Sequence, residues 1–202
     1  PPPNQPDDNP ALAPANNFRA NASDPLTQDF YTARIDHQLS VKDRLFGRLT
    51  IMHGPETAAA AYPIAAADER ATARENENRN FLINWQRTLR PALISEFRYM
   101  YYRRKFTNTG AGTGSGYNGR FKLAGVDPNA LARLTLTGHS GLGQTTNQRA
   151  QFPIQTHQFS ETMMWVKGNH TFKSGLDVRL SGSEEINDAS GGGVFGFSDR
   201  AT

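Results

Sequence analysis

The chain has 202 residues, of which 37% are hydrophobic, with a mean hydropathy of −0.63 and a net charge of +3 at pH 7. It contains no cysteine, which excludes disulfide frameworks, thiolate metal sites and cysteine nucleophiles. No apolar run reaches about 18 residues, so the sequence contains no transmembrane helix. The arginines are dispersed and not gathered in a basic run, so no nucleic-acid partner is predicted.

The first 28 residues are expected to form an extended lead-in segment. Their proline-rich start has neither the basic residues nor the apolar stretch of a signal peptide. The chain ends at Ala201 and Thr202, soon after a strand-like segment at residues 194–198. An exported protein needs a signal, so the chain is interpreted as an internal fragment of a longer protein.

Alternating polar and apolar residues predict three strand–turn–strand units. The paired segments are residues 29–39 with 44–52, 80–88 with 93–104, and 157–166 with 170–180. Each unit is closed by a short polar turn. Runs of nine to twelve residues are long for a soluble sheet and match a tilted membrane-spanning strand.

Long loops rich in small and polar residues are predicted at about residues 54–79, 107–156 and 182–193. Within the first of them, residues 65–77 favour a short helix because Ala, Asp, Glu and Arg dominate. Short turns at one end and long loops at the other are typical of outer-membrane β-barrels. Residues 29–202 are therefore predicted to be all-β: an antiparallel open sheet of about six long strands, part of a large transmembrane β-barrel with short periplasmic turns and long extracellular loops.

Alternation also divides each predicted strand into an apolar and a polar face. The contrast is cleanest near the end of the chain, where Phe172, Leu176 and Leu180 lie opposite Lys173 and Arg179. Such faces suit a barrel wall between lipid and water. They also suit a soluble β-sandwich, whose apolar faces stack on each other.

Glu161 is the exception on its strand, because it shares a face with apolar and aromatic neighbours. A carboxylate at the centre of a membrane is costly, so Glu161 either lies near an interface or marks an error in the face assignment. Several aromatic residues fall near the predicted strand ends and are interpreted as an interfacial girdle. They are Tyr31, Trp85, Tyr99, Tyr101, Tyr102, Phe159 and Trp165.

No motif in the chain predicts catalysis, and neither a cofactor nor a ligand-binding residue is assigned. The glycine-rich residues 110–116 lack the following helix and Lys-Ser or Lys-Thr pair of a phosphate-binding loop, and 117–120 carries no helix signature. Ser140 follows Gly138-His139 with the wrong spacing for a nucleophile elbow. The protein is expected not to be an enzyme.

No metal site is predicted either. The five histidines have no metal-ligand spacing and are interpreted as turn, interface or lumen residues. They are His37, His53, His139, His157 and His170. Calcium could bind the acidic residues near the end of the chain, but a solvated acidic loop is the preferred interpretation. These residues are Glu184, Glu185, Asp188 and Asp199.

Several segments, in this order and spacing, resemble one known family. They are residues 16–18, 32–40, 42–48, 90–98, 134–138, 165–175 and 193–198, and include an Arg-Ile-Asp-His strand, a Lys-Asp-Arg turn and a Gly-Asn-His-Thr turn. Over about residues 16–198 the chain resembles the barrel of TonB-dependent outer-membrane receptors of the Oar-like group. The resemblance implies a barrel of about 22 strands with an internal plug, to which this chain contributes about six.

The resemblance further implies energised uptake of a large nutrient across the outer membrane of a Gram-negative cell. The expected partners are outer-membrane lipid, an extracellular ligand contacted by the long loops, and the TonB complex through a plug segment that this chain lacks. Oligosaccharide, siderophore and peptide remain open as ligands. Two alternatives stay open: an outer-membrane adhesion protein without transport, and a secreted soluble β-sandwich that binds carbohydrate.

Overall fold

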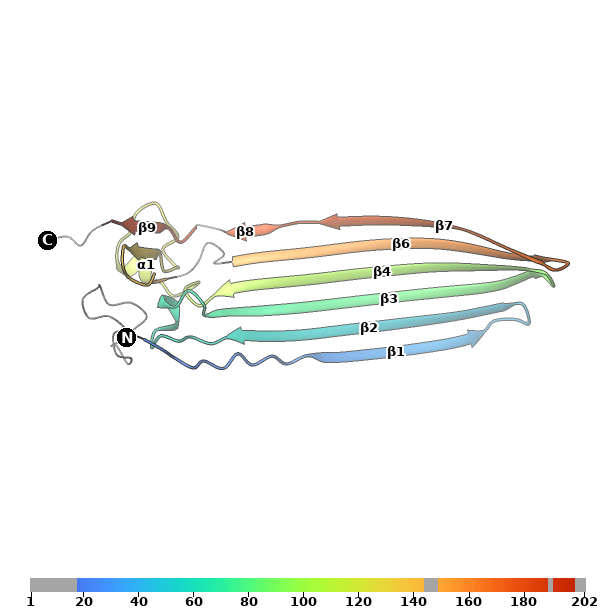
Figure 1. Cartoon of the computed structure of the whole chain (residues 1–202), viewed down its shortest axis with the longest axis horizontal. Helices are drawn as coiled ribbons and strands as arrows, with labels where there is room; N and C mark the ends of the chain where they lie inside the picture. Colours follow the sequence, from blue (N-terminus) through green and yellow to red (C-terminus); the bar gives the residue numbers. More distant parts are fainter. Residues whose placement is uncertain (1–17, 144–148, 189–190, 199–202) are drawn as a thin grey trace.

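Six long strands form one antiparallel sheet in a computed structural model that describes residues 18–143, 149–188 and 191–198 (Figure 1). Their order across the sheet is β1-β2-β3-β4-β6-β7. Their bounds are β1 (Asp29–Gln38), β2 (Asp43–Ala58), β3 (Thr72–Arg90), β4 (Leu93–Gly110), β6 (Arg149–Lys167) and β7 (His170–Ser183). The predicted all-β, antiparallel, open sheet is confirmed. Within the described residues, β1 and β7 are its edges and do not pair with each other.

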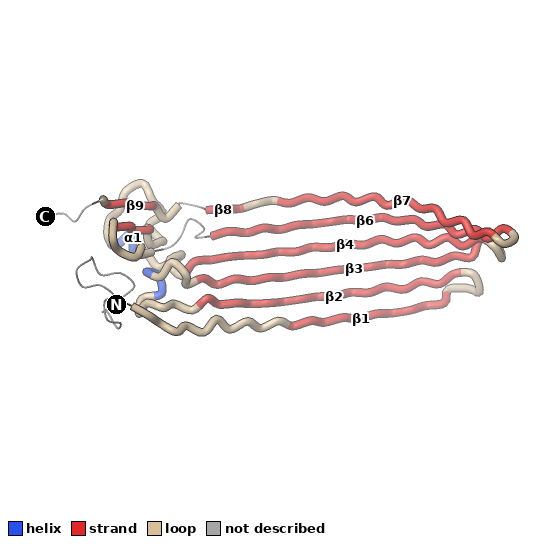
Figure 2. Tube along the Cα trace, in the orientation of Figure 1, coloured by secondary structure: helices blue, strands red, loops and turns tan. Residues whose placement is uncertain are grey.

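All three predicted hairpins are present, and their short turns lie together at one end of the sheet (Figure 2). Two residues, Gly168 and Asn169, join β6 to β7, and Gly168 adopts a φ of 59° that favours glycine. In the first turn, the Ser40 hydroxyl accepts hydrogen bonds from the amides of Lys42 and Asp43, each at 3.1 Å. We call this end of the sheet the turn end and the opposite one the loop end.

The strands extend much farther toward the loop end than the sequence indicates. β3 and β6 each have 19 residues and β4 has 18. The predicted loop at 54–79 is therefore confined to residues 59–71, and the one at 107–156 begins only after Gly110 and ends before Arg149. The third, at 182–193, contains the end of β7 and the short β8 (Ile186–Asp188), which pairs with β6.

The predicted helix at residues 65–77 is wrong. Only the 3-10 turn η1 (Ala65–Ala67) forms there, and residues 72–77 belong to β3. Each of these six residues pairs with β2 on one side and β4 on the other. Two ladders of backbone hydrogen bonds outweigh a helix propensity that amounts to a few tenths of a kcal/mol per residue.

A small cap lies at the loop end and consists of residues 111–143 and 191–198. It contains the one-turn helix α1 (Tyr117–Arg120), which the sequence did not predict, and the parallel pair β5 (Arg133–Leu136) and β9 (Val194–Phe197). The cap also contacts the 59–71 loop, because the Gly143 amide donates to the Ala67 carbonyl at 2.8 Å and Arg133 pairs with Glu69 at 3.1 Å. Gly143 has a φ of 85°, and a Cβ there would lie 2.3 Å from the Ala132 carbonyl oxygen.

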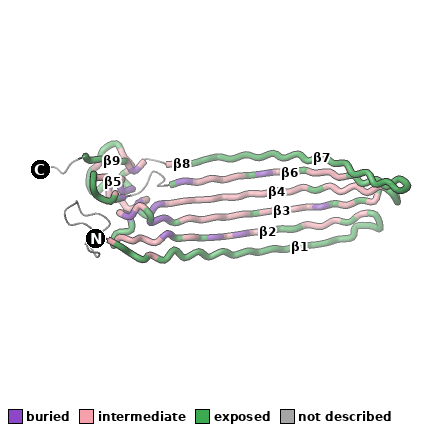
Figure 3. Tube along the Cα trace, in the orientation of Figure 1, coloured by how far each residue is buried: buried purple, intermediate pink, exposed green. Residues whose placement is uncertain are grey.

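Buried residues cluster in the cap and the adjoining loop, and a few more, such as Met52, Asn84 and Thr156, lie within β2, β3 and β6 (Figure 3). Every residue of β1 and β7 is exposed. Neither described helical segment is long or apolar enough to span a membrane. In the lead-in segment, Thr27 donates to the Pro55 carbonyl at 3.3 Å, so residues before β1 lie against β2.

Candidate functional site

Strand register sorts the side chains of the sheet into two faces, because residues directly opposite each other in an antiparallel pair point to the same side. One face carries an apolar band of three rows that run across all six strands. The central row is Ile35, Gly47, Ile83, Tyr99, Phe159 and Val178. The rows on either side are Ala33, Leu49, Phe81, Tyr101, His157 and Leu180 toward the loop end, and His37, Leu45, Trp85, Phe97, Glu161 and Leu176 toward the turn end.

No second sheet covers the apolar band within the described residues. Ile35 is 75% exposed and Leu176 68% exposed, whereas a β-sandwich would bury both. On β3 the band is bracketed by Arg79 and Arg87. The strand between them covers roughly 26 Å along its length, or about 19 Å of height at the usual tilt, which accounts for most of the ~25 Å apolar belt of a barrel in the outer membrane. This face is therefore suited to contact with lipid, and its exposure excludes the soluble β-sandwich.

The predicted aromatic girdle is confirmed only in part. Trp85 lies in the turn-end row, and the Trp165 ring lies 5.6 Å from that of Phe172 beyond it. Tyr31 and Tyr101 lie toward the loop end of the band. The other predicted members differ, since Tyr99 and Phe159 occupy the central row, while Tyr102 lies on the opposite face and donates to Asn78 Oδ1 at 3.3 Å. The prediction failed where strand ends were misplaced.

Glu161 lies on the apolar face, directly opposite Phe97 and Leu176. The face assignment therefore holds. The Ser95 hydroxyl donates a hydrogen bond of 2.6 Å to Glu161 Oε1, which partly compensates for a carboxylate among apolar side chains. Its row also contains Trp85, an aromatic residue of the kind found at membrane interfaces.

The opposite face of the sheet, the polar face, carries charged and amide side chains at the level of the apolar band. Arg34 binds Asp36 at 2.7 Å, and Glu96 accepts hydrogen bonds from Arg98 Nε at 2.6 Å and Asn84 at 2.7 Å. Both ion pairs join residues two apart on one strand. On the last hairpin, Gln158 donates to Asp177 at 2.6 Å and accepts from Arg179 at 3.3 Å.

Asparagines form a row along the polar face of β3, at Asn76, Asn78, Asn80 and Asn84. Arg104 donates to Asn76 Oδ1 at 3.3 Å, which holds one of these amides in place. The Asn80 Oδ1 atom is buried and has no hydrogen-bond partner in the described parts of the chain. The row therefore offers both donors and acceptors to a polar solute.

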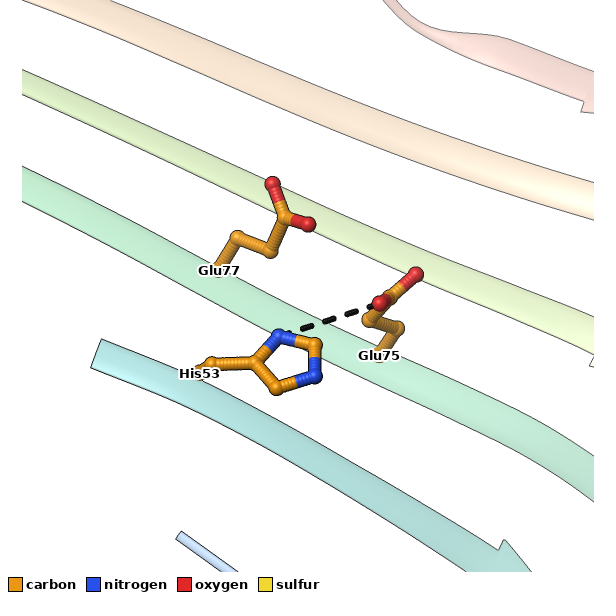
Figure 4. A group of neighbouring side chains, drawn as sticks. All are labelled: His53, Glu75 and Glu77. Atoms are coloured by element: carbon orange, nitrogen blue, oxygen red, sulfur yellow. Dashed lines mark ion pairs between the residues drawn. The ribbon is translucent and has the colours of Figure 1, made fainter. Parts of the chain in front are cut away.

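One group of described residues has the geometry to hold a metal ion (Figure 4). His53 on β2 and Glu75 and Glu77 on β3 bring one imidazole nitrogen and two carboxylate oxygens within 4.8 Å of one another, and His53 Nδ1 lies 3.8 Å from Glu75 Oε1. The sequence missed the group because only the β2–β3 register brings the residues together. It lies on the same face as the apolar band, beyond the loop-end row, and surface acidic groups often gather without a metal.

The other residues considered in the sequence remain dispersed. The Tyr99 hydroxyl and His157 Nδ1 share a hydrogen bond of 2.9 Å, while His37 and His170 lie near the turns. His139 and Ser140 lie in the cap, away from any strand-to-helix turn. Asp188 accepts the Gly191 amide at 2.9 Å, so it closes a turn, and Glu184 and Glu185 are exposed. Asp199 lies outside the described residues.

Comparison with known proteins gives one match. A family model described as an outer membrane beta barrel domain matches residues 1–202. No curated protein and no solved structure matches the chain.

Proposed function

The chain belongs to the outer-membrane β-barrel domain family, and from this premise we propose that it forms part of the wall of a TonB-dependent receptor that takes up a large polar nutrient. Its location is the outer membrane. The observation that carries the proposal is the separation of faces at one level of the sheet. The apolar band contacts lipid, and the polar face lines the lumen.

Orientation follows from the two ends of the sheet. In outer-membrane barrels, short turns face the periplasm and longer loops face outward. The turn end therefore lies in the periplasm and the loop end outside the cell. The cap and the loop-end halves of the strands are therefore the first parts of the protein that an external solute contacts.

The polar face supports transport of a polar solute. Arginine, glutamate and asparagine side chains along it supply both hydrogen-bond donors and hydrogen-bond acceptors. The order of short motifs that resembles Oar-like receptors is the second support. In the proposed mechanism the loops and lumen bind the solute, and a plug, moved through TonB, releases it inward without any covalent step.

The proposal is tested on the full-length protein in its native outer membrane. Uptake of three labelled probes, a maltooligosaccharide, a ferric hydroxamate and a short peptide, is compared in cells with and without TonB. We expect uptake of one probe to require both this protein and TonB, and to fall in an Asn80→Leu variant. Phe81→Leu, on the neighbouring lipid-facing position, is the matched control.

An adhesion function is the second candidate, because the cap is an ordered unit that presents exposed aromatic side chains. Phe121 is 59% exposed and Phe197 54% exposed. If no probe shows TonB-dependent uptake while deletion of the cap abolishes attachment of cells to a surface, transport is rejected in favour of adhesion.

A further inference from the structure

Three cations lie together on the apolar face, immediately beyond the loop-end row of the apolar band. Arg79 on β3 lies directly opposite Arg103 on β4. Lys105 lies two residues beyond Arg103 and points to the same side. We call Arg79, Arg103 and Lys105 the basic trio.

The basic trio is not neutralised by ion pairs within the described residues. Like charges directly opposite each other destabilise a strand pair. Elsewhere the sheet neutralises such residues, as when Arg34 binds Asp36 at 2.7 Å and Arg74 binds Glu56 at 3.0 Å. For the trio, no carboxylate of the described residues lies within ion-pair distance. Glu77 is directly opposite Lys105, yet its carboxylate gathers with Glu75 and His53 instead.

The surroundings of the trio leave room for an anion from outside the protein. On the β6 side the directly opposed residues are neutral, with Gln155 opposite Arg103 and Pro153 opposite Lys105. Toward the turn end the next row contains Phe81 and Tyr101, the start of the apolar band. A molecule bound here would place a negative group against the trio and an apolar part against the band.

We propose that the basic trio binds the phosphate groups of a phosphorylated lipid of the outer leaflet. Arginine matches phosphate because its guanidinium donates two parallel hydrogen bonds to a pair of oxygens, and two opposed arginines present two such forks. The loop end is the extracellular side, so the trio lies at the head-group level of that leaflet. The inference rests on the outward orientation of the apolar face in the proposed function, and it holds whether or not the barrel transports a solute.

The test uses the full-length protein in nonionic detergent and two lipid probes. The probes are lipid A, the phosphorylated anchor of lipopolysaccharide, and the same lipid after enzymatic removal of its phosphates. We expect Arg79→Gln/Arg103→Gln to weaken lipid A binding about tenfold, equivalent to ~1.4 kcal/mol. The matched control, Arg48→Gln/Arg179→Gln, removes the same charge from the polar face and should bind as the wild type does.

Four outcomes would overturn the proposal. They are unchanged binding in the Arg79/Arg103 variant, an equal loss in the polar-face control, equal affinity for the dephosphorylated lipid, and full displacement by ~10 mM inorganic phosphate, which would indicate a site for free anions. Compact migration of unboiled protein on a gel shows that each variant is folded. Should the double variant fail to fold, Lys105→Gln is measured instead and is expected to weaken lipid A binding about threefold.

Discussion

The six-stranded sheet, here called the wall, and the cap differ in how far they bury their side chains. In the wall, Ile35 is 75% exposed and Leu176 68% exposed, and β1 and β7 have no buried residue. In the cap, Asn118 is completely buried and Ala130 and Ala132 are each 1% exposed. The cap thus has a small core of its own. The wall relies on backbone hydrogen bonds between strands and on a solvent that differs between its two faces.

The chain can therefore be stable only where its surroundings suit both the wall and the cap. Apolar side chains that would cause aggregation in water are appropriate against lipid. The cap instead satisfies its polar groups internally, as the Asn118 side chain does with three backbone partners. Asn118 donates to the carbonyls of Asp127 and Gly192 at 2.8 Å each and accepts from the Ala132 amide at 2.7 Å.

The largest effect is expected from a charge in the centre of the apolar band. Ile83→Arg should destabilise the membrane-inserted full-length protein by about 2–4 kcal/mol, because arginine at the bilayer midplane loses its hydration. Met100→Arg is the matched control, since it lies at a similar level on the polar face, opposite the uncharged Leu82 and Gln158. Urea titration of unboiled gel mobility in lipid vesicles measures both. Equal destabilisation by the two variants would contradict the assignment of the faces.

A smaller and local effect is expected in the cap. Asn118→Ala removes three hydrogen bonds and leaves buried backbone groups unpaired, which should cost about 1–3 kcal/mol of local stability. Hydrogen exchange should then accelerate in residues 117–143 and 191–198 but not in the hairpin turns. Asn129→Ala, at an exposed position of the same segment, is the control. Faster exchange throughout the sheet would show that cap and wall unfold together.

A third prediction concerns the hydrogen bond between Ser95 and Glu161 on the apolar face. Ser95→Ala should lower the free energy of unfolding in lipid by about 1 kcal/mol, because it leaves the carboxylate without its donor. In a Glu161→Leu background the same change should be nearly neutral. Four unfolding curves complete this double-mutant cycle. Additive effects would mean that the serine stabilises the wall independently of Glu161.

The smallest effect is expected at Asp43, in the turn outside the apolar band. The Ser40 hydroxyl, donating at 2.7 Å, lowers the pKa of Asp43 below its usual value, helped by the Trp85 indole at 3.1 Å and by nearby Arg87. A carboxylate with a lowered pKa stabilises the fold above its unfolded value of 3.8, and this contribution disappears as the pH falls through the folded value.

Asp43→Asn should therefore be less stable than the wild type at about pH 6, and the difference should narrow progressively as the pH falls from 3.8 toward about 2. Thermal loss of compact gel mobility measures both proteins at both values. A difference that persists at the lower pH would assign the effect to the hydrogen-bond geometry of the turn instead of the charge on Asp43.

Much of the wall could be predicted from the sequence because alternation with a period of two fixes which side chains share a face. The positions of all three turns were predicted correctly, whereas the face of Glu161 was left open and is decided by the register of β6 against β4 and β7. The ends of the strands were not predicted correctly, because residues 72–79 are polar on both faces apart from Ala73, and residues 149–156 are interrupted by Pro153. Polar residues on both sides of a strand look like a loop when the neighbouring strands are unknown, and only the β2–β3–β4–β6 register reveals their pairing.

The cap and the charge clusters lay beyond prediction for a related reason. Asn118 contacts Gly192, which is 74 residues away in the sequence, and no local sequence pattern predicts that contact. The basic trio and the His53–Glu75–Glu77 group also depend on cross-strand register. In contrast, the absence of cysteine and the compact hairpin turns are local properties, and inferences from them needed no structure.

The length of the strands affects how the exposed loops and the cap can change during evolution. Beyond Phe81, nine residues of β3 continue toward the loop end, roughly 30 Å of strand and about 20 Å of height at the usual tilt. This stem crosses the head-group layer, so the loops and the cap begin beyond it. Insertions or exchanges at the tip, where antibodies and bacteriophages would first make contact, therefore leave the lipid-facing surface intact. The exposed epitopes are free to diversify without endangering insertion into the membrane.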